Sequence, residues 1–174
     1  MTLEELYHKF HVQVYNLALH YVQHPEDAEE ITQDVFVKAH AKLSTFRGEA
    51  DAGTWIYRIT INTSLDYLRA RKSGRSAFWL RVVSIQGKGK DPEPATFLHP
   101  GITMEHKEAL SALFQAINKL PERQRSALIL LKLEGLSTAE VARIMNLSTK
   151  ALESLFQRAK TQLKSILDQS KENE

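Results

Sequence analysis

The stretch from Ala139 to Lys160, AEVARIMNLSTKALESLFQRAK, carries side chains whose types and spacing suit recognition chemistry. Its second half places hydroxyl, amide and charged groups at the spacing of one helix face. Such groups can hydrogen-bond to base edges and to phosphate oxygens. The pattern therefore predicts a helix whose exposed face contacts DNA. The candidate residues are Thr149, Lys150, Glu153, Ser154, Gln157 and Arg158.

A helix-turn-helix would hold that face in place. The motif needs a small residue where its helices cross, a turn residue that tolerates positive φ, and a cap for the second helix. Ala142, Asn146 and Ser148 supply these in order. We expect two short helices joined by a tight turn, with the second anchored by Leu147, Leu152 and Leu155. A helical hairpin with a polar outer face is the alternative.

A second candidate surface lies upstream, in TWIYRITINTSLDYLRARK from Thr54 to Lys72. Basic groups can hold a phosphate backbone, and aromatic rings can stack on unpaired bases. Together they provide the chemistry of single-strand capture. For Trp55 and Tyr67, ordinary packing in a hydrophobic core is the alternative interpretation.

Catalytic and metal chemistry find little support in the sequence. His20 and His24 are spaced to share a metal, but no third ligand follows at a recognisable spacing, so two surface histidines are expected. The chain has no P-loop, glycine-rich nucleotide fingerprint or nucleophile motif. It also has no cysteine, which excludes disulfides and thiolate nucleophiles. We expect no enzyme activity, no metal, no cofactor and no small-molecule substrate.

Charge is distributed unevenly along this chain of 174 residues. Residues 1–51 hold four Lys and Arg against nine Asp and Glu, whereas residues 52–90 hold eight against one. An acidic segment beside a basic one predicts two kinds of partner. No apolar run approaches the roughly 18–20 residues of a membrane span. The N-terminus has no secretory signal pattern, and we expect a cytoplasmic protein.

Helical periodicity accounts for most of the chain, and no segment shows the alternation typical of a strand. The sequence predicts an all-α protein of two small helical domains, residues 1–72 and 105–174, with a flexible linker at 73–104. The stretch AFWLRVVSI at 77–85 is unusually apolar for a linker. It could extend the preceding helix, dock on the first domain or bind a partner. In the first domain, helices are expected at 3–23, from Pro25 to about Phe46, and from about Thr54 to Lys72, with RGEADAG, residues 47–53, as a loop. In the second domain, helices are expected from Met104 to Leu120 and from Pro121 to Gly135, followed by the two helices of the helix-turn-helix.

The order of these segments resembles the extracytoplasmic-function (ECF, group IV) sigma factors of bacterial RNA polymerase. The acidic helix EDAEEITQDVFVKAHAKLSTF precedes the aromatic and basic helix, and LPERQRSALILLKLEGLSTAEVARIMNLS follows the linker. The likeness runs from about Leu6 to Leu167. It implies an alternative-sigma initiation factor that binds core RNA polymerase, directs it to specific promoters and helps to open the minus-ten region.

The resemblance also implies how the work is divided between the domains. Residues 1–72 would be region two, which binds polymerase and melts and reads the minus-ten element. Residues 105–174 would be region four, which reads the minus-thirty-five element. Implied partners are the clamp coiled coil and flap of core polymerase, promoter DNA and an anti-sigma factor. The implied polymerase-binding residues are Glu29, Glu30, Gln33, Asp34 and Phe36. The implied minus-ten residues are Trp55, Arg58, Asn62, Arg69, Arg71 and Lys72, with Asn62 near a flipped base.

The chain departs from the family pattern at both DNA-reading sites. Ala52 and Gly53 stand where the family often has an aromatic and a basic residue. Leu152-Glu153-Ser154-Leu155 replaces the usual Val-Lys-Ser-Arg, so the minus-thirty-five sequence does not carry over. The alternative function is a two-domain helix-turn-helix regulator that binds duplex DNA as a dimer, without polymerase. The acidic helix followed by the aromatic and basic one favours the sigma factor, because a repressor needs neither.

Overall fold

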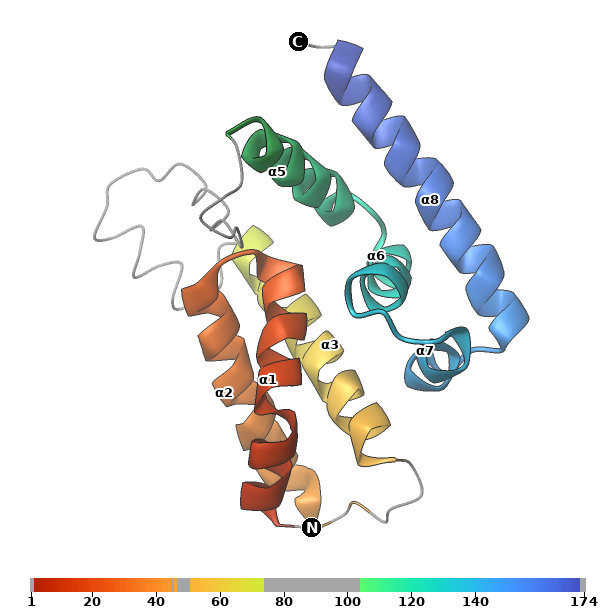
Figure 1. The fold of residues 1–174 in the computed structure, drawn as a ribbon. Coiled ribbons are helices and arrows are strands. Elements are labelled where there is room, and N and C mark those ends of the chain that lie inside the picture. The colour runs from red at the N-terminus through yellow and green to blue at the C-terminus, as the bar shows by residue number, and fades with distance from the viewer. Residues whose placement is uncertain (1, 45, 47–50, 74–103, 173–174) are drawn as a thin grey trace. The chain divides into compact units, whose positions relative to one another are not determined.

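The computed structural model describes residues 2–44, 46, 51–73 and 104–172. Within these ranges the regular secondary structure is helical throughout, which confirms the predicted all-α class. The contacts divide the chain into two compact units, Met1–Ala95 and Thr96–Glu174, and Figure 1 shows the helices of each. The dividing point falls inside the predicted linker. Residues 77–85 lie outside the described residues, so their role stays a prediction.

The first unit is a bundle of α1 (Leu3–Val22), α2 (Pro25–Leu43) and α3 (Ala52–Lys72), each packed against the other two (Figure 1). Apolar residues at three- and four-residue steps face inward from all three helices. Burying such a stripe is the main source of stability for an amphipathic helix. The fully buried side chains include Leu6, Val14, Leu17, Tyr21, Ile31, Val35 and Ile56.

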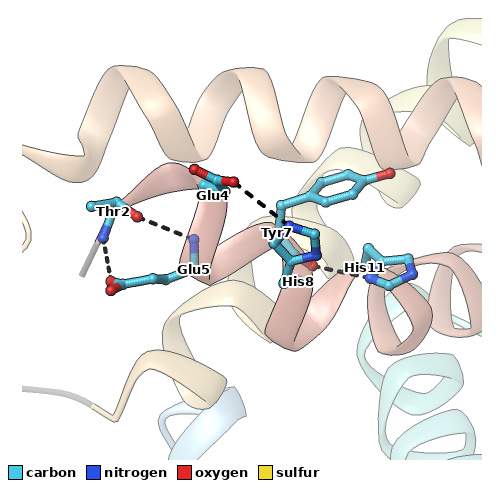
Figure 2. Close-up of polar contacts among 6 residues, drawn as sticks. All are labelled: Thr2, Glu4, Glu5, Tyr7, His8 and His11. Carbon is cyan, nitrogen blue, oxygen red and sulfur yellow. Dashed lines mark hydrogen bonds and ion pairs between the residues drawn. The ribbon is translucent and has the colours of Figure 1, made fainter.

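Local capping fixes both ends of α1. Figure 2 shows the start, where the Thr2 hydroxyl accepts from the Glu5 backbone N–H at 3.1 Å and the Glu5 carboxylate accepts from the Thr2 N–H at 2.7 Å. This reciprocal capping box satisfies two backbone donors that the first helical turn leaves without partners. At the other end Gln23 adopts the left-handed conformation, with φ 53°, and Pro25 then opens α2. The expected break between the two helices is confirmed.

The connection between α2 and α3 differs from the predicted one. The predicted α2 ends at Phe46, but the helix ends at Leu43, and the ring of Phe46 packs against Trp55 instead. The helix α3 begins at Ala52, inside the predicted loop. The Asp51 carboxylate causes this early start, because it accepts from the backbone N–H groups of Gly53 at 3.1 Å and Thr54 at 3.4 Å.

The second unit contains α5 (Met104–Asn118), α6 (Glu122–Leu128), a π-helical turn η1 (Ile129–Leu133), α7 (Thr138–Met145) and α8 (Thr149–Glu172). The guanidinium of Arg125 donates to the carbonyl oxygens of Asn118 and Leu120, which joins the end of α5 to α6. Buried apolar side chains from α5, the turn after it, η1, α7 and α8 make the core: Ile117, Leu120, Ile129, Leu130, Val141 and Leu152.

The predicted helix-turn-helix is formed by α7 and α8. Asn146 has φ 54° and ψ 52°, and the Ser148 hydroxyl accepts from the Ala151 N–H at 3.1 Å. Both local expectations are therefore confirmed. The expected short second helix is wrong, since α8 runs for 24 residues. It continues because Leu155, Ala159, Leu163 and Ile166 extend its apolar stripe, and α8 packs against α5 and α6 as well as α7.

Candidate nucleic-acid and polymerase interfaces

The acidic face of α2 is open to solvent. Glu29, Gln33 and Asp34 are exposed and Glu30 is partly exposed. The opposite face of the helix is buried in the bundle through Ile31 and Val35. Four of the five predicted polymerase-binding residues therefore lie together on one solvent-facing side of α2.

Phe36 is the fifth predicted polymerase-binding residue, and the structure places it differently. Its side chain is only 7% exposed, and its ring centroid lies 4.8 Å from that of Tyr7 on α1. A ring packed in this way holds α2 against α1 and offers little surface to a partner. The nearby exposed apolar side chains are Tyr7 and, on α2 itself, Val37.

Like charges crowd the acidic face. Partial burial raises the pKa of Glu30, and the carboxylates of Asp34 and Asp27 raise it further. Each effect penalises the ionised form of Glu30. A cationic partner placed over this face would relieve the repulsion, so its electrostatics suit a positively charged surface.

The exposed face of α3 carries cations and an amide. Arg58, Asn62 and Arg69 are exposed and lie four and seven residues apart, which places them on one side of the helix. Arg69 Nη1 donates to Asp66 Oδ1 at 2.7 Å, with more than half of each side chain exposed. Surface ion pairs of this kind contribute little free energy, so a phosphate can replace Asp66. Lys72 is exposed at the end of the helix.

Trp55 lies at the start of α3 and is partly buried. Its ring centroid is 4.6 Å from that of Phe46, with the planes inclined at 31°. The packing alternative thus accounts for part of the indole surface. A base that stacks on Trp55 would have to use the part of the indole that Phe46 does not cover.

Arg71 does not join the exposed cations. Its side chain is 21% exposed, and Nη1 donates to Asp27 Oδ2 at 3.3 Å. Its prediction as a DNA-backbone ligand is the least supported of the minus-ten set, because its guanidinium already holds a buried carboxylate. Asp27 lies in the first turn of α2. Arg71 lies 44 residues from Asp27, so no local pattern reveals this pairing.

The six predicted recognition residues form one exposed face of α8. Leu152 and Ala159 are fully buried on the opposite side. This arrangement confirms the predicted amphipathicity, while the DNA contacts themselves stay a prediction. The exposed residues are Thr149, Lys150, Glu153, Ser154, Gln157 and Arg158.

Two further cations lie beside this face. Lys132 Nζ is 5.6 Å from the ring centroid of Phe156, and Lys160 Nζ is 4.9 Å from it. Both lysines are exposed. Lys160 could have been found from its spacing after Gln157, but Lys132 comes from η1 and only the fold brings it here.

His24, one of the two histidines considered as metal ligands, lies close to Asp27. His24 Nδ1 lies 3.8 Å from Asp27 Oδ1, beside the same buried carboxylate. Among the described residues, no group of three or more His, Cys, Asp or Glu side chains is arranged to hold a metal ion. None of the described helices is long and apolar enough to cross a membrane.

Comparison with known proteins agrees with this geometry. The sigma-70 region 2 family model matches residues 6–74, and the sigma-70 region 4 model matches residues 110–163. The ECF RNA polymerase sigma-E factor of Escherichia coli K12 is 34% identical over 136 residues, covering 77% of this chain and 70% of that protein. The RNA polymerase sigma-H factor of Pseudomonas aeruginosa is 31% identical over 154 residues, covering 87% and 79%.

The two family models together define a sigma-70-type protein. The chain belongs to the extracytoplasmic-function family of RNA polymerase sigma factors. The RNA polymerase sigma factor YlaC of Bacillus subtilis matches over almost the whole length, at 28% identity across 99% of this chain and 96% of that protein. The sigma-factor prediction is confirmed over the alternative of a regulator that acts without polymerase.

Solved structures show the same fold. Bartonella quintana RpoE, in complex with the anti-sigma factor NepR, has a TM-score of 0.63 at 23% identity and covers 95% of this chain and 96% of its own. CnrH, in complex with the cytosolic domain of CnrY, has a TM-score of 0.61 at 23% identity and covers 95% and 87%.

Proposed function

We propose that this sigma factor binds core polymerase through α2, opens the minus-ten region through α3 and reads the minus-thirty-five element through α8. One observation carries the assignment within the first unit. Two helices of a single bundle present exposed faces of opposite charge, acidic on α2 and basic with an amide on α3. One face suits a cationic protein and the other suits a polyanion.

Glu29, Glu30, Gln33 and Asp34 are the proposed contacts to the clamp coiled coil. The raised pKa of Glu30 supports this role, because a cationic partner would offset the repulsion from Asp34 and Asp27. The second unit would meet the flap of the polymerase.

Arg58, Asn62, Arg69 and Lys72 are the proposed minus-ten contacts. The cations would hold the backbone, and Asn62 would hydrogen-bond to an unstacked base. Unstacking costs a few kcal/mol per base, so a protein that binds the unstacked base makes strand separation less costly. The chain needs no catalytic residue for this step, and chemistry belongs to the polymerase.

The exposed face of α8 is the proposed reader of the major groove. Glu153 can accept from a cytosine amino group, whereas Lys150 and Arg158 can bind guanine or phosphate. Lys132 and Lys160, beside Phe156, are proposed as phosphate contacts that orient the helix on the duplex.

We also propose that an anti-sigma factor covers the acidic face of α2 and that the protein acts in the cytoplasm. The support for the first proposal is that RpoE of Bartonella quintana was solved in complex with an anti-sigma factor. The support for the second is that CnrH was solved in complex with the cytosolic domain of CnrY.

Two pairs of substitutions separate the proposed roles. Glu30→Gln with Asp34→Asn should weaken binding to core polymerase. Asn62→Ala with Arg58→Gln should leave that binding unchanged but reduce promoter opening, measured by permanganate reactivity of unpaired thymines. If both double variants bind and open promoters like the unchanged chain, the residue assignments are wrong although the family is not in question.

A further inference from the structure

Asp27 is a buried carboxylate that none of the proposed binding surfaces uses. Its side chain is 5% exposed, in the first turn of α2. Burying an ionised carboxylate is costly unless charged and hydrogen-bonding partners compensate it. Arg71 Nη1 donates to it at 3.3 Å, the phenol of Tyr67 is hydrogen-bonded to it, and His24 Nδ1 lies 3.8 Å away.

The two partners from α3 come from consecutive turns of one helix face. Tyr67 and Arg71 are four residues apart, and such pairs lie side by side on a helix. They reach from the last turns of α3 to the first turn of α2. Asp27 therefore joins the end of one helix to the start of the other, and we call Asp27, Tyr67 and Arg71 the α2–α3 joint.

The protonation of the Tyr67 phenol is fixed by its environment. Burial raises the pKa of the Tyr67 phenol most, and the charge and hydrogen bond of Asp27 raise it further, against the opposing effect of Arg71. The phenol therefore stays protonated at neutral pH and donates to the carboxylate. One other carboxylate acts on the joint, because the charge of Glu30 interacts with both Asp27 and Tyr67.

Arg71, the α3 cation of the joint, lies within the basic end of α3. Arg69 and Lys72, both proposed to contact the DNA backbone, flank Arg71 on the same turn. Helix ends fray unless something holds them. The directions of these two cations therefore depend on how firmly the last turn is seated against α2.

We propose that Asp27 is a positioning residue for promoter opening: by holding Arg71 and Tyr67 it orients the basic end of α3 so that Arg69 and Lys72 meet the DNA backbone. The inference rests on the proposed role of α3 in binding DNA. It assigns Arg71 to the joint rather than to a phosphate.

A double-mutant cycle tests this assignment in the full chain bound to core polymerase. Asp27→Asn, Arg71→Gln and their combination are compared for the rate of promoter opening and for the salt dependence of promoter affinity. Residues of one network couple strongly. We expect each single change to slow opening by roughly tenfold, the combination to slow it no further, and the slope of log affinity against log salt to fall by the same amount in all three variants.

The opposite pattern would overturn the proposal. If Arg71 is a phosphate ligand, Asp27→Asn frees it and opening is unchanged or faster. Arg71→Gln alone would then weaken binding and reduce the slope of log affinity against log salt by about 1. Additive effects of the two single changes would also contradict a shared joint.

Milder variants keep the test decisive if Asp27→Asn unfolds the bundle. Tyr67→Phe removes only the hydroxyl and should slow opening by a few-fold, while thermal unfolding and polymerase binding change little. Arg71→Lys retains a cation and should restore most of the opening lost in Arg71→Gln. A Tyr67→Phe chain that opens promoters normally, together with no rescue by lysine, would refute the joint's role.

Arg69→Gln separates this inference from the proposed function. Loss of opening with Arg69→Gln but not with Asp27→Asn would overturn only the positioning role of Asp27. No loss with Arg69→Gln and Lys72→Gln together would show that the proposed DNA face at the end of α3 is wrong, and the positioning role would fall with it.

Discussion

The indole of Trp55 packs against the ring of Phe46, with ring centroids 4.6 Å apart. Phe46 follows the end of α2, and Trp55 lies in the first turn of α3. The pair thus joins the two sides of the connection between the proposed polymerase-binding helix and the proposed DNA-opening helix. Part of the Trp55 surface is used by the protein itself.

This pair should contribute to stability as well as to DNA binding. Aromatic pairs are worth about 0.5–1.5 kcal/mol beyond the area they bury. We expect Phe46→Ala and Trp55→Ala each to lower the free energy of unfolding by about 1–2 kcal/mol, and the double variant to lose less than the sum. Urea unfolding followed by circular dichroism measures this, and strictly additive losses would show that the rings do not interact.

Asn146 should tolerate glycine but not alanine. Its φ of 54° is left-handed, a conformation that costs residues with an ordinary side chain about 1–2 kcal/mol. Asn146→Ala should destabilise α7 and α8 by about 1 kcal/mol, while Asn146→Gly should be nearly neutral. The second unit contains neither Trp nor Tyr between residues 104 and 172. Hydrogen exchange of the α7 and α8 amides therefore provides the readout, and equal protection in both variants would contradict the prediction.

Replacing Glu30 with a neutral residue should raise the stability of the folded chain while weakening polymerase binding. Its pKa is raised in the folded chain by partial burial and then by Asp34 and Asp27. The folded state therefore holds this proton more tightly than the unfolded one. The resulting stabilisation is fully present below the unfolded pKa of 4.5 and is lost as the pH rises through the folded pKa. Ionised Glu30 consequently costs stability at pH 7.

We therefore expect Glu30→Gln to raise the unfolding midpoint at pH 7, to lose that advantage below pH 4.5, and to weaken polymerase binding. Glu29→Gln removes one exposed charge from the same helix and serves as the control for the unfolding midpoint. A midpoint that is unchanged or lowered by Glu30→Gln at pH 7 would show that the like charges do not strain the folded state.

Replacing Lys132 or Lys160 with glutamine should weaken promoter binding without changing its sequence preference. A phosphate contact contributes to affinity by releasing counterions. Each change to glutamine should reduce the slope of log affinity against log salt by about 1 and affect all minus-thirty-five sequences alike. Lys119→Gln, at an exposed position just after α5, is the matched control. An effect that depends on the base sequence would instead indicate contact with base edges.

Features set by neighbouring residues could be predicted from the sequence. The turn at Asn146, the Ser148 cap and the exposed face of α8 depend on spacings of a few residues, and all three appear in the structure. The break at Pro25 depends on the chemistry of one residue. Such features need no knowledge of how distant segments pack.

Contacts between residues far apart in the sequence could not be predicted. Phe36 reads as part of an acidic surface, but Tyr7 of α1 covers its ring. Arg71 reads as one more cation in LRARK, but Asp27 holds it. Lys132 gains its place beside Phe156 only when η1 meets α8. Charge and periodicity identify which residues are polar, while packing decides which of them remain available to a partner.

Reconstituted transcription tests the central claim most directly. Sigma-free core polymerase is given fragmented genomic DNA from the source bacterium, with and without this chain, and run-off transcripts are mapped. We predict discrete transcripts that require the chain, with start sites that share a minus-ten and a minus-thirty-five element. No chain-dependent transcript, together with tight binding of the chain alone to duplex DNA, would contradict the account.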